Sequence, residues 1–279
     1  MEKLSLITGA NSGIGKETAV GLARKGFAVV MACRNRQKGE AALRDVRLRS
    51  GSSSVELMML DLADLSSVRR LAAEFLDTHR RLDVLINNAG VILTKRSVTV
   101  DGFETTFQVN YLSHFLLTRL LLDRVEQSSP SRIVNVSSRA HFRGSIHFDD
   151  LQCSRGYSAF KSYGQSKLAQ VLFTYELARR LAGTGVDVNC VHPGSVASRW
   201  GRGKRDWLSF GLAIASVFET RPEKAAETTI MVASDPSLQG VTGRYFANRK
   251  ESRSSSRSHD METARRLWDV SCHLLGMDA

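Results

Sequence analysis

A glycine-rich turn between an apolar run and a helical pattern stands at the start of this chain. The turn reads Thr8-Gly9-Ala10-Asn11-Ser12-Gly13-Ile14-Gly15, with an apolar run over residues 4–7 before it and a helical pattern over residues 17–25 after it. Such a turn directs backbone N–H groups and the positive end of a helix toward one point, where a diphosphate binds. Glycine is required because a Cβ would block the tight turn and the approach of the phosphates. The spacing G-x-x-x-G-x-G differs from the commonest dinucleotide fingerprint, so a purely steric reason for the glycines stays open.

The residues after the second apolar run indicate which dinucleotide the turn binds. A site for NAD usually carries Asp or Glu about 20 residues beyond the glycines, where the carboxylate binds the ribose 2′-hydroxyl. No acid stands between residues 31 and 39, where Arg34, Arg36 and Lys38 occur instead, and Lys16 stands beside the glycine turn. Cations suit a 2′-phosphate, and the arginine fork binds it through two N–H groups. The sequence therefore predicts NADP(H), with a solvated basic helix start as the alternative.

The length and composition favour an α/β protein with a substantial core. The chain has 279 residues, of which 42% are hydrophobic, and this is typical of globular domains. Its 4 cysteines are scattered without a zinc or disulfide pattern, which suits a reducing compartment. The first strand begins almost at once, so we expect no signal or transit peptide, and no apolar stretch approaches the ~20 residues of a membrane span. We therefore expect a cytoplasmic protein.

The formal net charge of +11 raises the question of an anionic partner. The basic residues are spread along the chain, with modest clusters in residues 199–205 and 244–257. No nucleic-acid recognition motif accompanies them, so we expect no nucleic acid as a partner. A weak attraction to anionic membrane surfaces stays compatible with the charge.

Strand-like runs alternate with helical patterns along most of the chain. This alternation predicts a doubly wound, Rossmann-type α/β domain, in which a parallel sheet of about seven strands carries helices on both faces. No internal repeat or linker divides it, so we expect one domain over residues 1–279. We expect strands at residues 4–7, 27–33, 55–60, 82–86, 132–137, 186–191 and 242–246. We expect helices at residues 37–49, 66–79, 103–125, 162–181, 222–233 and 261–275, and an exposed polar loop at residues 248–260.

Polar residues follow four of the predicted strands. These groups are Asp61-Leu62, Asn87-Asn88-Ala89-Gly90, Ser137-Ser138 and His192-Pro193-Gly194. Ligands of doubly wound folds bind beyond the carboxyl ends of the strands, so these groups would share one rim with the glycine turn. Each group alone is also compatible with ordinary turn chemistry.

Tyr163 and Lys167 stand four residues apart in a helical pattern and therefore share one helix face. An ammonium beside a phenol favours the phenolate and lowers a tyrosine pKa that is normally about 10. This suits proton exchange near neutral pH. The spacing also arises by chance on solvated helices. A hydroxyl of Ser137 or Ser138 near this helix would hydrogen-bond a substrate carbonyl, which favours the catalytic interpretation.

These motifs together resemble those of classical short-chain dehydrogenases/reductases. In the order of that family, the chain carries Thr8-Gly9-x-x-x-Gly13-x-Gly15, Asn87-Asn88-Ala89-Gly90, Asn110, Val136-Ser137-Ser138, Tyr163-x-x-x-Lys167 and Pro193-Gly194. Within the family, the chain is similar to the retinol dehydrogenase-like members. That similarity is carried by Ala32-Cys33-Arg34, Asp101-Gly102-Phe103-Glu104, the Ala140-His141 pair after the serines, and residues 265–271.

The resemblance implies a role for each matching residue. Tyr163 would donate the proton in reduction or accept it in oxidation, and Lys167 would lower its pKa and bind the nicotinamide ribose. Ser138 would orient the carbonyl, and Asn110 would support a water-linked proton path to Lys167. The implied cofactor-binding set is Gly9, Asn11, Ser12, Gly13, Ile14, Gly15, Arg34, Asn35, Asp61, Leu62, Asn88, Ala89, Gly90, Tyr163, Lys167, Pro193, Gly194 and Val196. No metal is expected.

Residues 195–220 are expected to form a substrate lid with an apolar surface. The segment carries Trp200 and Trp207 among other apolar residues and several glycines that permit hinge motion. Residues that simply pack in a core would show the same composition. An apolar lid favours a lipophilic carbonyl such as a retinoid, a steroid or a long-chain aldehyde. Basic residues beside the tryptophans would let the lid rest on an anionic membrane.

We therefore expect an NADP(H)-dependent oxidoreductase that interconverts an alcohol and an aldehyde or ketone. The resemblance is compatible with a homo-oligomer. The alternative is an NADP-binding sensor or scaffold protein without turnover. The complete set of Ser138, Tyr163 and Lys167 argues against that alternative, because a binding protein has no need of a tuned phenol.

Overall fold

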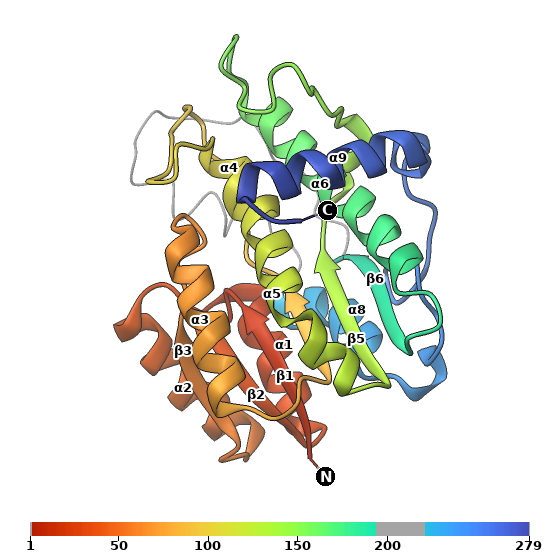
Figure 1. Ribbon diagram of the computed structural model, residues 1–279. Helices are drawn as coiled ribbons and strands as arrows, with labels where there is room; N and C mark the ends of the chain where they lie inside the picture. Colours follow the sequence, from red (N-terminus) through yellow and green to blue (C-terminus); the bar gives the residue numbers. More distant parts are fainter. Residues whose placement is uncertain (1, 194–220, 279) are drawn as a thin grey trace.

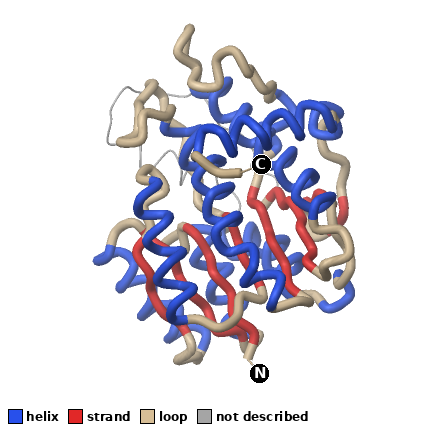
Figure 2. The backbone as a smooth tube through the Cα atoms, in the orientation of Figure 1, coloured by secondary structure: helices blue, strands red, loops and turns tan. Residues whose placement is uncertain are grey.

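A sheet of eight strands forms the centre of the part of the chain that the computed structural model describes, residues 2–193 and 221–278. The strand order is β3-β2-β1-β4-β5-β6-β7-β8, and helices pack on both faces (Figures 1 and 2). The strands are β1 (Lys3–Thr8), β2 (Phe27–Cys33), β3 (Val55–Met59), β4 (Val84–Asn87), β5 (Ser131–Val136), β6 (Val186–His192), β7 (Arg244–Ala247) and β8 (Lys250–Glu251).

The helices connect the strands as the alternating pattern predicts. They are α1 (Gly13–Arg24), α2 (Arg36–Ser50), α3 (Leu65–Thr78), α4 (Thr105–Phe107), α5 (Ser113–Gln127), α6 (Ala159–Arg180), α8 (Pro222–Ser234) and α9 (Met261–Leu275). Strands β1 to β7 are parallel, with Leu6 of β1 opposite Val30 of β2 and Leu85 of β4. The doubly wound α/β fold is therefore confirmed. The strand order reverses between β1 and β4, which is where such sheets bind ligands.

Two apolar layers enclose the sheet. Helices α1, α2 and α8 cover one face, and α3, α5 and α6 cover the other (Figure 1). Helix α3 shows how the sequence specifies this packing, because Val68, Leu71, Ala72 and Phe75 recur on one helix face and are all buried. The Asp64 side chain caps the same helix at the Ser66 amide, 2.9 Å away.

Helix α9 begins and ends at the residues that the sequence predicts. It packs against α6, and its Trp268 ring lies edge-on to Phe115 of α5, with 4.9 Å between ring centroids. The Arg180 guanidinium of α6 covers the same indole at 4.1 Å. These contacts join the C-terminal helix to α5 and to α6, the helix that carries Tyr163 and Lys167.

The predicted single helix over residues 103–125 is wrong in one respect. A short helix α4 is followed by a π-helical turn, Gln108–Leu112, and only then by α5. Turns of this kind insert one extra residue per turn and are frequent at functional sites. Asn110 lies in this turn.

The expectation of an exposed loop at residues 248–260 is confirmed for most of its side chains, but the segment contains a strand that the sequence did not predict. Strand β8 pairs antiparallel with β7 and adds an eighth strand to the sheet. Ser255 and Ser258 beyond it are buried, and a 3-10 turn covers Ser256–His259. Tyr175 and His141 hydrogen-bond Ser254 and Ser255 from distant parts of the chain, which explains why part of this polar segment packs against the fold. We refer to residues 252–259 as the serine strap.

The predicted lid, residues 195–220, lies outside the described residues, as do Gly194 and Val196. Among the described residues, no helix is long and apolar enough to cross a membrane. All four cysteines are buried and carry free thiols.

Candidate active site

The glycine turn lies at the carboxyl edge of the sheet, between β1 and α1. Gly9 and Gly13 have φ angles of +68° and +54°, which L-residues other than glycine rarely adopt. A Cβ at Gly15 would lie 2.5 Å from both the Gly9 carbonyl oxygen and the Asn88 side-chain nitrogen. The turn therefore needs glycine at Gly9 and Gly13 for conformation, and at Gly15 for close contact with the turn after β4.

Thr8 fixes the turn after β4 against the glycine turn. Its hydroxyl oxygen accepts the backbone N–H groups of Asn88, at 2.9 Å, and Ala89, at 3.0 Å. It also lies 2.9 Å from Nε2 of buried His114. The other ring nitrogen of His114 faces the Asn110 carbonyl at 3.1 Å. Thr8 thus links β1, the turn after β4 and the π-helical turn.

The partners of His114 determine its tautomer. The Asn110 carbonyl can only accept, so Nδ1 carries the proton and Nε2 accepts the Thr8 hydroxyl hydrogen. Both lone pairs of Thr8 then stay free for the two amides. Burial lowers the pKa of His114 to about 4, so the ring is neutral at pH 7. Thr8 and His114 were not among the predicted site residues. The four-residue spacing of Asn110 and His114, which places both on one helix face, is the sequence signal for their contact.

The N-terminus of α1 fits a diphosphate. The Ser12 side chain makes no capping hydrogen bond, and the first turn contains no acidic residue. The first backbone N–H groups of a helix lack intrahelical partners and attract anions. Asn11, Ser12 and Ile14 belong to this turn. In contrast, Asn35 caps α2 by accepting the Lys38 amide at 2.9 Å, so the side chain of Asn35 is already engaged.

The cations expected near a 2′-phosphate differ in their surroundings. Gly9 donates to the Ala32 carbonyl near the end of β2 at 2.8 Å, and exposed Arg34 directly follows that strand. Lys16 pairs with Asp45 at 2.7 Å and is therefore already neutralised. Of these two cations, Arg34 is the one left exposed and available to a phosphorylated ribose.

Asp61 and Leu62 follow β3 on the same edge of the sheet. The Asp61 carboxylate accepts the Ala63 amide at 2.9 Å, which rigidifies the turn. The Leu62 carbonyl accepts hydrogen bonds from Gln108 and from the Ser113 hydroxyl, the latter at 2.6 Å. These contacts hold the predicted adenine-side residues against the π-helical turn.

Asn110 joins the turn after β4 to the catalytic helix α6. Its side-chain oxygen accepts the Val91 amide at 2.7 Å, and its nitrogen donates to the Val91 carbonyl at 2.9 Å. The same nitrogen donates to the Ser166 hydroxyl at 3.0 Å, which in turn donates to the Tyr163 carbonyl at 2.8 Å. Asn110 is fully buried, so this network fixes the position of α6 relative to the sheet.

Gly90 lies between Asn110 and Lys167. A Cβ at Gly90 would lie 3.3 Å from the Asn110 side-chain oxygen and 3.5 Å from Lys167 Nζ. A side chain at this position would therefore crowd both polar groups. Because Gly90 has no side chain, there is room along the strand ends for a ligand that extends from the glycine turn to α6.

Lys167 is a buried cation with 4% of its surface exposed. Its Nζ donates to the Val136 carbonyl at 3.0 Å and to the Gln170 side-chain oxygen at 2.9 Å. It lies 5.5 Å from the centroid of the Tyr163 ring. Burial lowers the pKa of Lys167 to about 8, which still leaves the ammonium form in the majority at pH 7.

The structure brings Ser138 and Tyr163 together. Ser138 lies beside Tyr163, and its hydroxyl opposes part of the effect of burial on the Tyr163 pKa. The net result is a raised pKa, because desolvation dominates. The expected lowering of this pKa by Lys167 is therefore not found in this structure, where Lys167 directs its hydrogen bonds to Val136 and Gln170. Tyr163 remains a neutral phenol that can donate a proton.

Pro193 follows β6 on the same edge, next to buried His192. Burial lowers the pKa of His192 to about 4, and Arg139, His141 and Lys167 act in the same direction. This rim of the site is therefore occupied by a neutral ring. The structure thus brings the glycine turn, the turn after β4, Asn110, Ser138, Tyr163 and Lys167 to one edge of the sheet.

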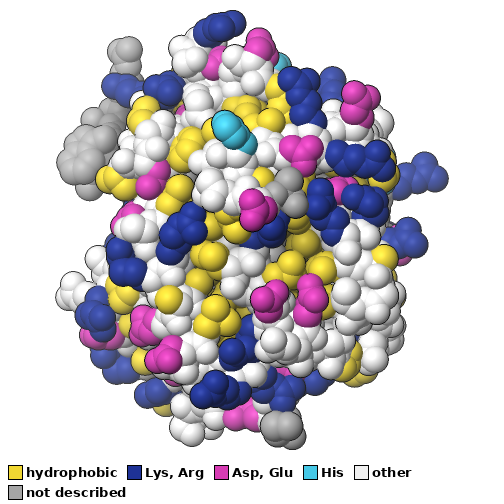
Figure 3. Space-filling view, viewed as in Figure 1, with side chains coloured by type: hydrophobic (Ala, Val, Ile, Leu, Met, Phe, Trp, Pro, Cys, Tyr) yellow, Lys and Arg dark blue, Asp and Glu magenta, His cyan; other side chains and the backbone are white. Residues whose placement is uncertain are grey.

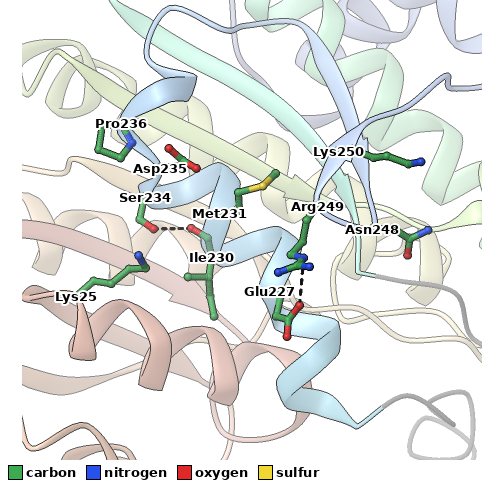
Figure 4. Close-up of a pocket in the computed structure, with 10 residues that line it drawn as sticks. All are labelled: Lys25, Glu227, Ile230, Met231, Ser234, Asp235, Pro236, Asn248, Arg249 and Lys250. Atoms are coloured by element: carbon green, nitrogen blue, oxygen red, sulfur yellow. Dashed lines mark hydrogen bonds and ion pairs between the residues drawn. The ribbon is translucent and has the colours of Figure 1, made fainter.

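A surface hollow of about 790 Å³ lies elsewhere, along α8 (Figure 4). Arg249 of the β7–β8 turn forms an ion pair with Glu227 across it, at 3.4 Å. None of the predicted catalytic or cofactor-binding residues lines this hollow. It is a groove beside α8 and the hairpin, separate from the candidate site.

Comparison with known proteins identifies the family. A family model described as short chain dehydrogenase matches residues 3–209. The chain belongs to the short-chain dehydrogenase/reductase family. Retinol dehydrogenase 12 of Mus musculus is 48% identical to this short-chain dehydrogenase/reductase over 275 residues, which cover 99% of the chain and 87% of that relative. Retinol dehydrogenase 13 of Homo sapiens is 45% identical over 283 residues, which cover 99% of the chain and 86% of that relative.

Solved structures agree with this assignment. An uncharacterised protein from Mycobacterium Paratuberculosis aligns with a TM-score of 0.81 at 38% identity, covering 99% of this chain and 94% of that one. The Pseudomonas aeruginosa RhlG/NADP active-site complex aligns with a TM-score of 0.68 at 27% identity, covering 88% and 94%. This short-chain dehydrogenase/reductase is an oxidoreductase that acts on a small-molecule substrate with a nicotinamide nucleotide as cofactor.

Proposed function

We propose that the protein is an NADP(H)-dependent oxidoreductase that interconverts a lipophilic alcohol and its aldehyde or ketone. The observation that carries the proposal is the meeting of Ser138, Tyr163 and Lys167 at the sheet edge that also holds the glycine turn. A nucleotide sensor without turnover does not need a buried cation beside a phenol that contacts a serine. This contact set therefore supports catalysis over binding alone.

The residues of the chain divide the chemical work among them. When bound, the nicotinamide supplies the hydride in reduction. The Ser138 hydroxyl donates a hydrogen bond to the substrate carbonyl oxygen and polarises it. Tyr163 is a neutral phenol at pH 7, and burial raises its pKa further; it donates a proton to the same oxygen as negative charge develops there. The Lys167 ammonium stabilises the resulting phenolate and is held ready by Val136 and Gln170.

The preference for NADP(H) rests on Arg34. The exposed guanidinium follows β2 where an NAD site carries a carboxylate. The RhlG structure, which is a complex with NADP, supports the same choice. Arg34→Asp removes a phosphate partner and adds repulsion. We expect this variant to lose most of its preference for NADPH over NADH, measured as the ratio of kcat/KM values. Equal efficiency with both cofactors in the unmodified enzyme would contradict the assignment.

A retinoid-type substrate is supported by the relatives. Several proteins that are 43–48% identical to this chain are named retinol dehydrogenases. The apolar composition of residues 195–220 supports a lipophilic substrate independently.

We propose further that the protein is cytoplasmic and that its basic surface gives it peripheral contact with membranes, where such substrates dissolve. We propose as well that the protein forms a homo-oligomer.

The decisive assay follows NADPH absorbance with retinal, steroid ketones, sugars and an aldehyde series of rising chain length. We expect kcat/KM to rise with chain length and to be low for sugars.

Tyr163→Phe should abolish turnover and leave NADPH binding nearly unchanged, because only the proton donor is lost. Ser138→Ala should lower the rate by about 10²–10³. NADPH binding without turnover of any carbonyl would favour the sensor, and a preference for small polar carbonyls would remove the lipophilic substrate.

A further inference from the structure

His141 lies fully buried three residues after Ser138, between the candidate site and the serine strap. Its Nδ1 is 2.7 Å from the Ser138 carbonyl oxygen. Its Nε2 is 3.0 Å from the backbone nitrogen of Ser255, which is 114 residues away along the chain. The ring packs against Tyr245 of β7, with 5.0 Å between centroids. One imidazole thus bridges the segment of the catalytic serine and a distant segment.

Its two partners leave only one arrangement of protons. The Ser138 carbonyl only accepts, so Nδ1 must donate, and the Ser255 amide only donates, so Nε2 must accept. The ring is therefore neutral and carries its proton on Nδ1. Burial, which lowers the pKa of His141, favours the same neutral form. A charged ring would carry a second N–H on Nε2, and this group would point at the Ser255 N–H with no acceptor between them.

The serine strap is itself anchored to rigid parts of the fold. The Tyr175 hydroxyl of α6 is 2.7 Å from the Ser254 hydroxyl, and Ser258 donates to Ser254 at 2.8 Å. Arg257 donates to the Gly144 carbonyl at 3.1 Å, beyond the 3-10 turn that follows Ser138. The strap therefore holds the Ser138 segment at both of its ends, through His141 and through Gly144.

We propose that His141 is a positioning residue, which sets the orientation of Ser138 toward the substrate by fixing the Ser138 carbonyl and tying it to the serine strap. The inference rests on the proposed function of Ser138. The peptide that His141 holds is the one that carries the Ser138 side chain, and the side chain also accepts the Ala140 amide at 3.2 Å. A shift of this peptide moves the hydroxyl that polarises the carbonyl, and small misplacements of catalytic groups cost about 10² in rate.

Two amide variants separate the two halves of the bridge. In His141→Asn, the side-chain nitrogen takes the place of Nδ1 and can donate to the Ser138 carbonyl, but the contact to Ser255 is lost. In His141→Gln, the side-chain oxygen reaches the place of Nε2 and can accept from Ser255, but the contact to Ser138 is lost. Each variant gives up one hydrogen bond, so the two should lower Tm by similar amounts.

The proposal predicts that their kinetics differ. We expect His141→Asn to keep kcat for carbonyl reduction within about threefold of the unmodified enzyme, and His141→Gln to lose about 10² in kcat. NADPH binding, followed by fluorescence, and Tm should change little between the two. His259→Asn is the matched control, because His259 lies in the same strap, hydrogen-bonds Ser254 and does not contact the Ser138 segment. It should keep full activity.

The outcomes distinguish this inference from the proposed function. Lack of turnover in the unmodified protein contradicts the function itself. If that protein turns over and both His141 variants lose kcat equally, in proportion to their loss of Tm, His141 is only structural. Retention of kcat by His141→Gln contradicts the role as well. Nitrogen-15 NMR of the unmodified protein tests the geometry without any turnover, and a ring protonated on Nε2 at pH 7 would overturn the proposal.

Discussion

Lys167 is a cation kept in the interior of the protein for its chemistry. Its two hydrogen bonds to Val136 and Gln170 offset only part of the cost of removing an ammonium from water. The lowered pKa, about 8 against an ordinary 10.5, expresses the remaining cost. Such residues are typical of active sites, where stability is given up for function.

Replacement of Lys167 by Met should abolish turnover and change how stability depends on pH. The unfolded chain binds more protons than the folded one between pH 8 and 10.5, so the contribution of Lys167 to the free energy of unfolding becomes more favourable as pH rises through this window. Each pKa unit corresponds to about 1.4 kcal/mol, so the difference between the unmodified protein and the variant should shift by about 3 kcal/mol. Urea unfolding of both proteins from pH 7 to pH 10.5 measures it, and a constant difference would show that Lys167 is not desolvated.

Residue identity at the site could be predicted, but the electrostatic state of the residues could not. The spacing of Tyr163 and Lys167 placed both on one helix face, as the structure has them. Their pKa values depend on burial and on contacts made across the fold, and no local pattern encodes these. The same applies to His114 and His141, whose partners lie 106 and 114 residues away along the chain.

At the level of elements, the position of α6 depends on a contact between two glycines. A Cβ on Gly144 would lie 2.2 Å from the Gly164 carbonyl oxygen, next to Tyr163 in the helix. Gly144 has φ −74° and ψ 153°, which alanine adopts without strain. Any cost of a substitution there is therefore steric, and the atom in the way belongs to the helix backbone and not to a flexible side chain.

Gly144→Ala should displace the first turns of α6 or unfold the 3-10 turn before it. We expect a loss of about 1–3 kcal/mol in the free energy of unfolding, as for overpacked cores, and a larger fractional loss of kcat than of NADPH affinity. Denaturant unfolding and steady-state kinetics measure the two effects. Ser145→Ala, a change of similar size at the next position, serves as the control and should be close to unmodified in both. Unchanged stability of Gly144→Ala would contradict the tight contact.

Element types were more predictable than their irregularities. Continuous apolar runs such as β2 and the one-sided apolar face of α3 have periods that the sequence displays directly. The π-helical turn around Asn110 was missed because one inserted residue barely disturbs the helical period. Strand β8 was missed because a strand of two charged residues has no apolar alternation, and its pairing depends on β7 beside it.

For the molecule as a whole, the order of strands and helices fixed the fold class, because alternation leaves few arrangements of a covered parallel sheet. Electrostatics on this scale follows from composition and the surface. Figure 3 shows Lys and Arg side chains spread over the visible face, with acidic side chains among them. The net charge of +11 is therefore diffuse on this face, in keeping with the spread of basic residues along the sequence.

A diffuse positive field predicts weak, salt-sensitive attraction to anionic membranes. We expect the protein to sediment with vesicles that contain phosphatidylserine at ~0.01 M salt, where the Debye length is ~30 Å and many charges act together. At ~0.1 M salt the Debye length is ~10 Å, and most of the protein should be released. NADPH should not alter the distribution, and vesicles of neutral phosphatidylcholine serve as the control. Equal binding to neutral vesicles would assign the contact to apolar insertion instead of charge, and no binding at low salt would show that a field of this kind is too weak to hold the enzyme at a membrane.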